Sequence, residues 1–368
     1  MRLGKLLAAV PLLFASLTFA SDPIIIGHST VQSGPLVSLA TGPLQGIRAL
    51  VDSVNARGGV SGRPLELLIL DDGYEADRAA ENVTSAVEQG AVAILMPIGT
   101  VPSLGAAQAA NELGIPLIGP YTGAAPVRRH SPWAFMVRTG FQEEYDFIIR
   151  HLLTLNITDI AFAFNDNAGA RGAMEGTART LEASGHALSA ALVIQNDASD
   201  AREQARAMAS LNPAALLLSI SNNVAAEFIP AFRQAGGQSQ IYSFSFLNGR
   251  ALQQDIGEYA DNIIISQVVP HPWTVSMTLI RDYQDAMRSA GHQELSYDSL
   301  EGYLNARLLV DALNAAAPEI TRESIRDALE AMNDHSVAGF PIRYSPDNHN
   351  GSSFIDLTML RGDGRYIR

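Results

Sequence analysis

The sequence contains no cysteine, and its only lysine is Lys5. The first absence excludes disulfides, thiolate metal sites, iron–sulfur clusters, a thiol nucleophile and a lipid anchor on an N-terminal cysteine. The second excludes Walker A nucleotide chemistry and Schiff-base catalysis, because both need a lysine amine. Basic residues are also few: Lys and Arg total 25 against 38 Asp and Glu, a net charge of −13. A surface this negative argues against nucleic acid or an anionic membrane as a partner.

Signatures of common enzymes are missing as well. There is no G-x-S-x-G or H-E-x-x-H motif, and no two of the eight histidines are spaced i,i+3 or i,i+4. Asp71 and Asp72 resemble a carboxylate pair, but no neighbouring ligand completes a metal set, so a solvated loop or a helix cap is the expected role. His28 ends the first expected strand, where a hydrogen-bonded structural role is expected. We therefore expect no catalytic residue, no metal site and no cofactor.

The N-terminus has the pattern of an export signal. Arg2 and Lys5 precede an apolar run over residues 6–14, and Thr18 and Ala20 place small residues at positions −3 and −1 of a cleavage site. This pattern predicts a signal peptide over residues 1–20, with a buried N-terminal helix as the alternative. The run is too short to span a bilayer, and no later stretch is apolar and long enough. We expect a periplasmic protein without a lipid anchor.

The rest of the chain alternates expected strands and helices. Expected strands lie at 24–27, 65–70, 93–96 and 115–118, then again at 160–164, 188–194, 215–220, 241–246 and 263–269, and last at 340–344 and 354–360. Helical patterns lie at 44–55, 76–89, 102–113, 142–155, 172–184, 201–211, 224–235, 275–290, 300–315 and 321–332. Continuous apolar strands between amphipathic helices indicate parallel sheets covered on both faces. Because 368 residues exceed what one core usually holds, we predict an α/β fold of two doubly wound lobes.

Ligands of open parallel sheets bind beyond the carboxyl ends of the strands. Four loops at expected strand ends are rich in Gly, Ser, Thr and Pro and poor in charge: 29–35, 97–103, 119–123 and 246–249. Hydroxyls and free backbone N–H groups at helix N-termini suit an anionic group such as a carboxylate. The same residues are also typical of ordinary strand-to-helix turns, so composition alone leaves both readings open.

Several motifs keep their order and spacing over essentially the whole chain after residue 20. They are Ile25-Ile26-Gly27 with Ser33-Gly34-Pro35, the block from Asn55 to Leu65 with its glycines, Leu70-Asp71-Asp72, the block from Gly114 to Pro120, the block from Phe135 to Thr139, and Leu300-Glu301-Gly302-Tyr303. Together they resemble the type I periplasmic binding proteins of the leucine–isoleucine–valine-binding group, which feed ABC importers. The glycine block between residues 55 and 65 is the most specific of these motifs.

The resemblance implies a clamp of two lobes joined by a three-stranded hinge. Lobe 1 is expected to comprise residues 21–139 plus 273–337, and lobe 2 residues 140–272 plus 338–368. It also implies a monomer that closes on one small ligand and delivers it to ABC permease subunits in the membrane. Two alternatives remain: a sensor subunit that signals to a membrane receptor, and an exported enzyme on the same architecture.

The resemblance further implies which residues touch the ligand. In the family, loops after the third and fourth strands hold a ligand carboxylate, which gives Thr100 as a hydroxyl donor and Tyr121, Thr122 and Gly123 as further contacts. In the second lobe the amino-acid binders place an acid that pairs with the ligand ammonium. That position here is Ser245, followed by Phe246.

Three departures concern the rest of the family's site. Besides Ser245 in place of the acid, the aromatic residue of the first loop is replaced by Leu39 or a neighbour, and residues 165–169 lack the tyrosine of the second lobe. The carboxylate half is therefore retained and the amino half is not, with Asp166 or Glu301 as candidate substitutes. The ligand is expected to be an α-amino acid or another small carboxylate, including an aromatic or keto acid.

Overall fold

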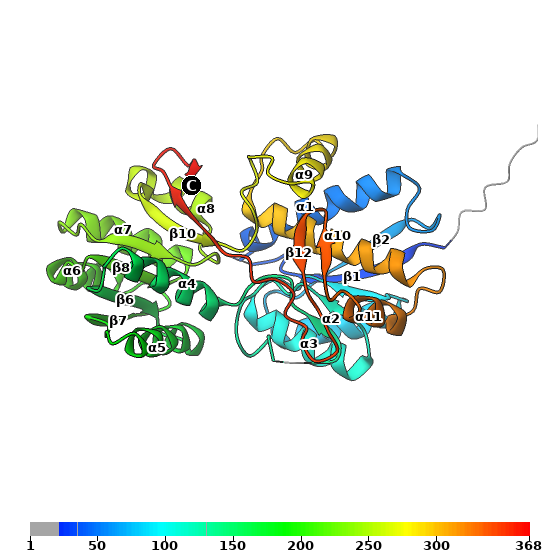
Figure 1. The fold of residues 1–368 in the computed structure, drawn as a ribbon, viewed down its shortest axis with the longest axis horizontal. Helices are drawn as coiled ribbons and strands as arrows, with labels where there is room; N and C mark the ends of the chain where they lie inside the picture. The colour runs from blue at the N-terminus through cyan, green and yellow to red at the C-terminus, as the bar shows by residue number, and fades with distance from the viewer. Residues whose placement is uncertain (1–21, 35, 130) are drawn as a thin grey trace, which may run out of the picture.

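The computed structural model describes residues 22–34, 36–129 and 131–368. The predicted signal peptide lies outside these residues. Two parallel sheets covered by helices form two lobes that lie side by side (Figure 1). Within the described residues, no helix combines the length and the apolar character needed to cross a bilayer.

The first lobe is built on a five-stranded sheet in the order β2-β1-β3-β4-β5. Its strands are β1 (Ile24–Thr30), β2 (Leu65–Asp71), β3 (Ala93–Leu95), β4 (Leu117–Ile118) and β5 (Ala134–Phe135), all parallel. Its helices are α1 (Ser38–Ala56), α2 (Ala76–Glu88) and α3 (Thr100–Leu113), joined later in the chain by α9 (Thr278–Ser289), α10 (Tyr297–Ala316) and α11 (Arg322–Glu330). A short hairpin, β11 (His335–Val337) and β12 (Phe340–Ile342), completes it.

The second lobe carries a seven-stranded sheet in the order β14-β13-β10-β9-β8-β6-β7. The parallel strands are β6 (Ile160–Asn165), β7 (Ala190–Ile194), β8 (Ala215–Ser219), β9 (Gln240–Ser243) and β10 (Ile263–Gln267), and β13 (Asp356–Leu360) and β14 (Tyr366–Ile367) pair antiparallel. The helices are α4 (Phe141–Thr154), α5 (Ala168–Ala183), α6 (Ala201–Leu211), α7 (Asn222–Gln234) and α8 (Gly249–Ile256), followed by a 3-10 turn over Gly257–Ala260. The predicted pair of doubly wound lobes is confirmed.

Glycine lets α1 and α10 approach each other closely in the first lobe. A Cβ atom on Gly46 would lie 1.8 Å from the carbonyl oxygen of Ser299, and one on Gly302 would lie 2.1 Å from that of Pro43. Both neighbours are backbone atoms, which cannot rotate away. The close contact fixes the N-terminal turn of α10, which points toward the second lobe.

Three elements differ from the sequence expectation for identifiable reasons. Helix α1 begins at Ser38, six residues before the expected start. Pro43 lies inside the helix, where proline is disfavoured, and the helical pattern was therefore expected to begin only after it. Strand β9 ends at Ser243, three residues early, and the chain turns there into α8. Helix α8 was not expected, because it is only eight residues long and half of these residues are polar.

Three crossovers connect the lobes, and the third differs from its expected place. Phe340 and Ile342 pack in the core of the first lobe, and Asn350 forms a bridge with Met136 beside β5. The chain passes to the second lobe only after residue 351, where Thr139 Oγ1 donates to the carbonyl oxygens of Ser352 (3.3 Å) and Phe354 (2.9 Å). The third crossover was expected at residue 338, but this packing places residues 338–351 on the first lobe. Apolar alternation in the sequence indicates burial but does not say in which core.

Candidate ligand site between the lobes

Two threonine hydroxyls meet at the carboxyl ends of neighbouring strands. Thr100 begins α3 after β3, Thr122 follows β4, and their Oγ1 atoms lie 2.8 Å apart. The backbone N–H of Ala124 donates to Thr122 Oγ1 at 3.1 Å. Thr122 is fully buried, whereas Thr100 is half-buried. The exposed hydroxyl of the pair is therefore that of Thr100, at a helix N-terminus whose first backbone N–H groups have no partner within the helix.

An aromatic side chain covers the turn before Thr100. Gly99 has φ +88°, and a Cβ atom there would lie 2.4 Å from Cε2 of Tyr74. Only glycine fits both the backbone conformation and the space. Tyr74 was not among the predicted site residues, although it directly follows Asp71-Asp72-Gly73 at the end of β2.

The two aspartates at the end of β2 hold the neighbouring loops in place. Asp72 is buried and accepts hydrogen bonds from Ser29 Oγ at 2.9 Å and from the Tyr74 N–H at 2.8 Å. Asp71 accepts from Ser33 Oγ at 2.6 Å and from the Gln32 N–H at 2.8 Å. These bonds hold the pKa of Asp71 well below its usual range. The role expected for the pair, a solvated loop or a helix cap, is thus wrong for Asp72, which is buried and does not cap α2.

His28 has the structural role expected from its place in the sequence. Its side chain is fully buried, and Nδ1 lies 2.8 Å from the carbonyl oxygen of Leu95. Burial lowers the pKa of His28 to about 4, so the ring is neutral at physiological pH. Together, the hydrogen bonds of His28 and the two aspartates join the carboxyl ends of β1, β2 and β3, next to Thr100.

Tyr121 and Gly123 each contact a residue of another element. The Tyr121 hydroxyl donates to Asp298 Oδ1 at 2.6 Å, on the first turn of α10. Gly123 accepts a 2.9 Å hydrogen bond from the backbone N–H of Phe141, and a Cβ atom on it would lie 2.5 Å from that ring. Gly123 thus seats the start of α4 against the first lobe.

Arg138, in the first crossover, lies between carboxylates of both lobes. Its Nη2 atom lies 3.5 Å from Glu144 of α4, and its Nη1 atom lies 3.5 Å from Glu301 of α10. The guanidinium also stacks over the rings of Tyr121 (5.4 Å) and Phe141 (5.5 Å). Burial raises the pKa of Glu301 to about 7 although Arg138 opposes the shift, and burial raises the pKa of Glu144 as well.

Ser245 belongs to the same network. Its hydroxyl donates to Glu144 Oε1 and its backbone N–H donates to Oε2, each at 2.9 Å, and Arg138 donates to its oxygen. The carboxylate of Glu144 therefore lies beside the Ser245 position, but Glu144 belongs to α4 and its carboxylate already accepts hydrogen bonds from several donors. The next residue, Phe246, is half-buried and packs against the rings of Phe141 and Phe244 at centroid distances of 6.0 and 6.2 Å.

The lobes touch directly at the N-terminal turn of α10. Asn248 Nδ2, on the loop before α8, donates to Asp298 Oδ2 at 2.9 Å, and Arg250 pairs with Glu294 at 2.7 Å. Asp298 thus accepts from one neutral donor of each lobe. Burial raises the pKa of this carboxyl, and the Tyr121 hydroxyl and the charge of Arg138 oppose the shift.

The structure brings some of the predicted residues together and separates others. Thr100 and Thr122 are in contact, Ser245 and Phe246 follow β9 on the second lobe, and Tyr121 lies between these groups beside Arg138. Of the candidate substitutes for the missing acid, Glu301 pairs with Arg138, whereas Asp166 forms an exposed pair with Arg171 at 2.8 Å.

Sequence reasoning missed the roles of Glu144, Asn248 and Asp298. A signal existed for Glu144, because a single acid on an apolar helical face requires a buried partner. Asn248 and Asp298 gave no such signal, because a polar residue at the start of a helix is an ordinary cap.

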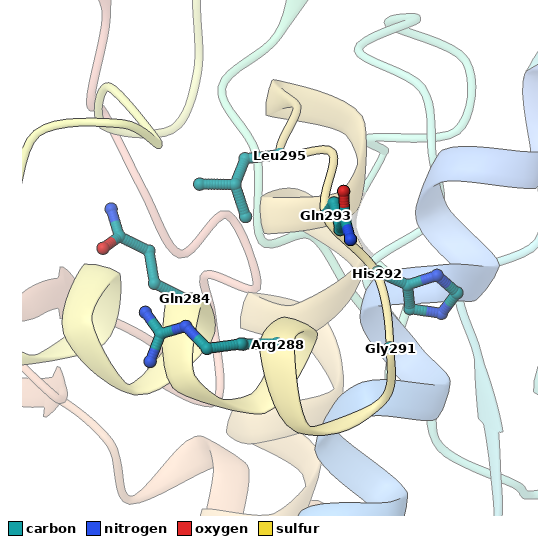
Figure 2. A pocket seen from close by; sticks show the side chains of 6 residues that line it. All are labelled: Gln284, Arg288, Gly291, His292, Gln293 and Leu295. Atoms are coloured by element: carbon teal, nitrogen blue, oxygen red, sulfur yellow. The ribbon is translucent and has the colours of Figure 1, made fainter.

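Other surface features lie apart from this region. A hollow beside α9 is lined by Gln284, Arg288, Gly291, His292, Gln293 and Leu295, and none of the predicted site residues is among them (Figure 2). Among the residues that the structure describes, no group of three His, Asp or Glu side chains is placed to hold a metal ion.

Two parallel-sheet lobes, three crossovers and polar strand ends between the lobes define a type I periplasmic binding protein fold. The family model described as periplasmic binding protein matches residues 23–365, and the chain belongs to this family. The resemblance inferred from the sequence motifs is thereby confirmed. No curated protein sequence matches the chain significantly.

Solved structures extend the comparison. An extracellular ligand-binding receptor from Verminephrobacter eiseniae is 24% identical, with a TM-score of 0.86 over 94% of this chain and 100% of that one. A substrate-binding periplasmic protein from Ralstonia solanacearum is 27% identical, with a TM-score of 0.85 over 94% and 99%. A possible leucine/isoleucine/valine-binding protein from Rhodopirellula baltica is also 27% identical, with a TM-score of 0.85 over 96% and 98%.

Proposed function

We propose that this periplasmic binding protein is the solute-binding component of an ABC importer and captures a small carboxylate between its lobes. The observation that carries the proposal is the hydroxyl pair of Thr100 and Thr122, 2.8 Å apart at the N-terminus of α3. A hydroxyl and free backbone N–H groups at a helix start are suited to an anion. Each hydrogen bond to a charged acceptor contributes roughly 1.5–3 kcal/mol.

The second lobe supports a ligand whose remaining part is apolar or only weakly polar. Phe246 is half-buried beside Phe141, and the hydroxyl of Ser245 is engaged with Glu144 and Arg138. An ammonium at the Ser245 position would therefore find no free carboxylate. Aromatic and keto acids join the branched-chain amino acids as candidate ligands, and Asp298 is the remaining carboxylate for a ligand that carries an ammonium.

The cell biology follows from the proposed role. The mature chain acts in the periplasm after removal of residues 1–20, as a monomer that closes on one ligand and then meets the permease subunits. The relatives whose names refer to substrate binding and to leucine, isoleucine and valine support this role. The Verminephrobacter relative, called a ligand-binding receptor, favours a sensor subunit as the second candidate.

The experiment is a thermal-shift screen of the mature chain against amino acids, keto acids and aromatic acids, followed by calorimetric titration of each hit. A ligand present at 100-fold its Kd adds about 2.7 kcal/mol to the free energy of unfolding, which raises Tm measurably. We expect at least one hit in this screen, and loss of binding when the carboxylate of that ligand is replaced by a primary amide. A hit that binds equally well as its amide would contradict the proposal.

Recovery of the ligand from the titrated complex distinguishes a binding protein from an enzyme, and a second assay distinguishes an importer from a sensor. The bound ligand is recovered by denaturing the complex, and a binding protein returns it unchanged whereas an enzyme returns product. Uptake of radiolabelled ligand by cells with and without the gene then distinguishes the importer, which requires the chain for uptake, from the sensor, which does not.

A further inference from the structure

Arg138 links the two lobes at the point where the chain first passes between them. One of its partners, Glu144, belongs to the second lobe, and the other, Glu301, belongs to the first. All three side chains are at most 5% exposed. Because Arg138 sits in the crossover, a rotation of the lobes changes the position of Glu301 relative to the other two groups.

The two glutamates are held very differently. Glu144 accepts from the N–H and hydroxyl of Ser245, and from Ser266 Oγ at 2.5 Å, in addition to its contact with Arg138. Glu301 Oε1 is buried and accepts no hydrogen bond from any residue that the structure describes. Its charge is balanced by Arg138 Nη1 at 3.5 Å, so the charged state of Glu301 depends on one contact that spans the hinge.

The other groups around Glu301 are negative or neutral. Asp298 precedes it by three residues on the same face of α10, Glu144 lies on the far side of Arg138, and the Tyr121 hydroxyl is committed to Asp298. Three carboxylates thus surround one guanidinium in a water-poor region. Burial and the two neighbouring carboxylates together hold the pKa of Glu301 at about 7, within the range that an exported protein meets.

We propose that Glu301 is a proton-controlled link between the lobes. When Glu301 is charged, three buried carboxylates face one guanidinium. When Glu301 takes up a proton, one of these negative charges is removed, and Arg138 keeps Glu144 and Ser245 on the second lobe and its stacking on Tyr121 on the first. Because opening admits water to Glu301 and so lowers its pKa, the proton is bound more tightly with the lobes together, and the open form gains population as the pH rises. This inference concerns the ligand-free protein and does not depend on which solute it binds.

The chain allows a direct measurement because it has no cysteine of its own. Dyes attached at Glu81→Cys on α2 and Glu182→Cys on α5, two exposed positions on different lobes (Figure 1), report the distance between the lobes. We expect energy transfer to fall as the ligand-free protein is taken from pH 5.5 to pH 8, with a midpoint near 7. Glu301→Gln should remove this transition and hold the transfer at the low-pH value.

Glu319→Gln, an exposed position before α11, is the matched control and should keep the wild-type midpoint. His271 in the second crossover is a competing titratable group, but burial lowers its pKa and it gains its proton at lower pH than Glu301. A transition that persists unchanged in Glu301→Gln would overturn the proposal.

Small-angle scattering of the unlabelled wild-type protein keeps the test valid if a variant fails to fold. The radius of gyration should rise on the same pH curve as the energy transfer falls. A radius that stays constant from pH 8 to pH 5.5 would overturn the proposal even if every variant were lost. Because no ligand is present, neither result bears on whether the solute is a carboxylate, and failure of the ligand screen would leave this inference intact.

Discussion

The side-chain amide of Asn248, on the second lobe, donates a 2.9 Å hydrogen bond to Asp298 on the first lobe. The same carboxylate accepts from Tyr121 of its own lobe at 2.6 Å. Asp298 is thereby a point at which the two lobes meet through uncharged donors, close to the strand ends where the ligand is proposed to bind. We expect the relative position of the lobes to depend on this contact.

Asn248→Asp should separate the lobes. The change sets a second carboxylate against Asp298, and like charges in a partly buried position repel strongly. It keeps the oxygen that caps α8 by accepting from the Ala251 N–H at 2.9 Å, so the helix itself should be unaffected. We expect a larger radius of gyration at pH 8 and weaker ligand binding.

Asn167→Asp is the control for this substitution, because Asn167 caps α5 in the same way, accepting from the Ala170 N–H at 2.9 Å, and is exposed. It should leave the radius of gyration unchanged. Equal radii for the two variants would show that the contact between Asn248 and Asp298 does not hold the lobes together.

Thr100→Val should weaken binding of the ligand found in the screen by about 1.5–3 kcal/mol, the amount expected for one hydrogen bond to a charged group. The side chain keeps its shape but loses its hydroxyl, and with it the hydrogen bond to the buried Thr122 hydroxyl, so the free energy of unfolding should also fall, by about 0.5–1.5 kcal/mol. Calorimetry measures the affinity and urea unfolding the stability. Thr84→Val, on the exposed face of α2, is the matched control and should bind normally. Affinity within twofold of wild type would remove Thr100 from the site.

The stability of the protein should depend on pH through Glu301. Its pKa is raised from 4.5 to about 7, so the folded protein binds this proton more tightly than the unfolded chain does. The contribution to stability is therefore full below pH 4.5 and is lost as the pH rises toward 7. Since one pKa unit corresponds to about 1.4 kcal/mol, the loss is on the order of 3 kcal/mol.

Urea unfolding at pH 5 and pH 7.5 checks this sign. The wild type should lose stability between the two values, after subtraction of the change seen in Glu301→Gln, which lacks the titrating group. If both proteins show the same difference between pH 5 and pH 7.5, Glu301 does not titrate in this range.

Gly46→Ala should destabilise the first lobe. The added Cβ would meet the backbone carbonyl of Ser299 at 1.8 Å, so α1 and α10 must move apart, at a cost of roughly 1–3 kcal/mol. Gly172→Ala on α5 is the control, since its Cβ would meet no atom within 4 Å. It should be neutral or stabilising by about 0.5–1 kcal/mol, because alanine favours the helix. Thermal unfolding of both variants decides between these expectations.

The sequence was sufficient for features that depend on local pattern and much less so for contacts between the lobes. Buried runs such as that of β6, and the helices between them, predicted two parallel sheets. Strand ends rich in hydroxyls predicted the region of Thr100 and Thr122, because parallel strands end at one edge of a sheet. Asp298 and Asn248 lie 50 residues apart on different lobes. Their pairing depends on how the crossovers orient the lobes, which no local pattern encodes.

The same reason explains Ser245 and the third crossover. The resemblance identified the position where other family members carry an acid, but the acid beside it here comes from α4, more than 100 residues earlier in the chain. Likewise, Phe340 and Ile342 form an ordinary apolar strand pattern that would fit either core. Which core they join depends on a tertiary contact, the pairing of the segment around Asn350 with Met136 beside β5.

Because the chain crosses three times, neither lobe is complete when its first stretch has been synthesised. The first sheet is present by residue 135, yet the face of α1 around Gly46 stays uncovered until α10, residues 297–316, has been made. The second sheet gains its last strands only with residues 356–367. A growing chain therefore has no complete lobe that could fold early, and both cores can close only after the C-terminal residues have been made.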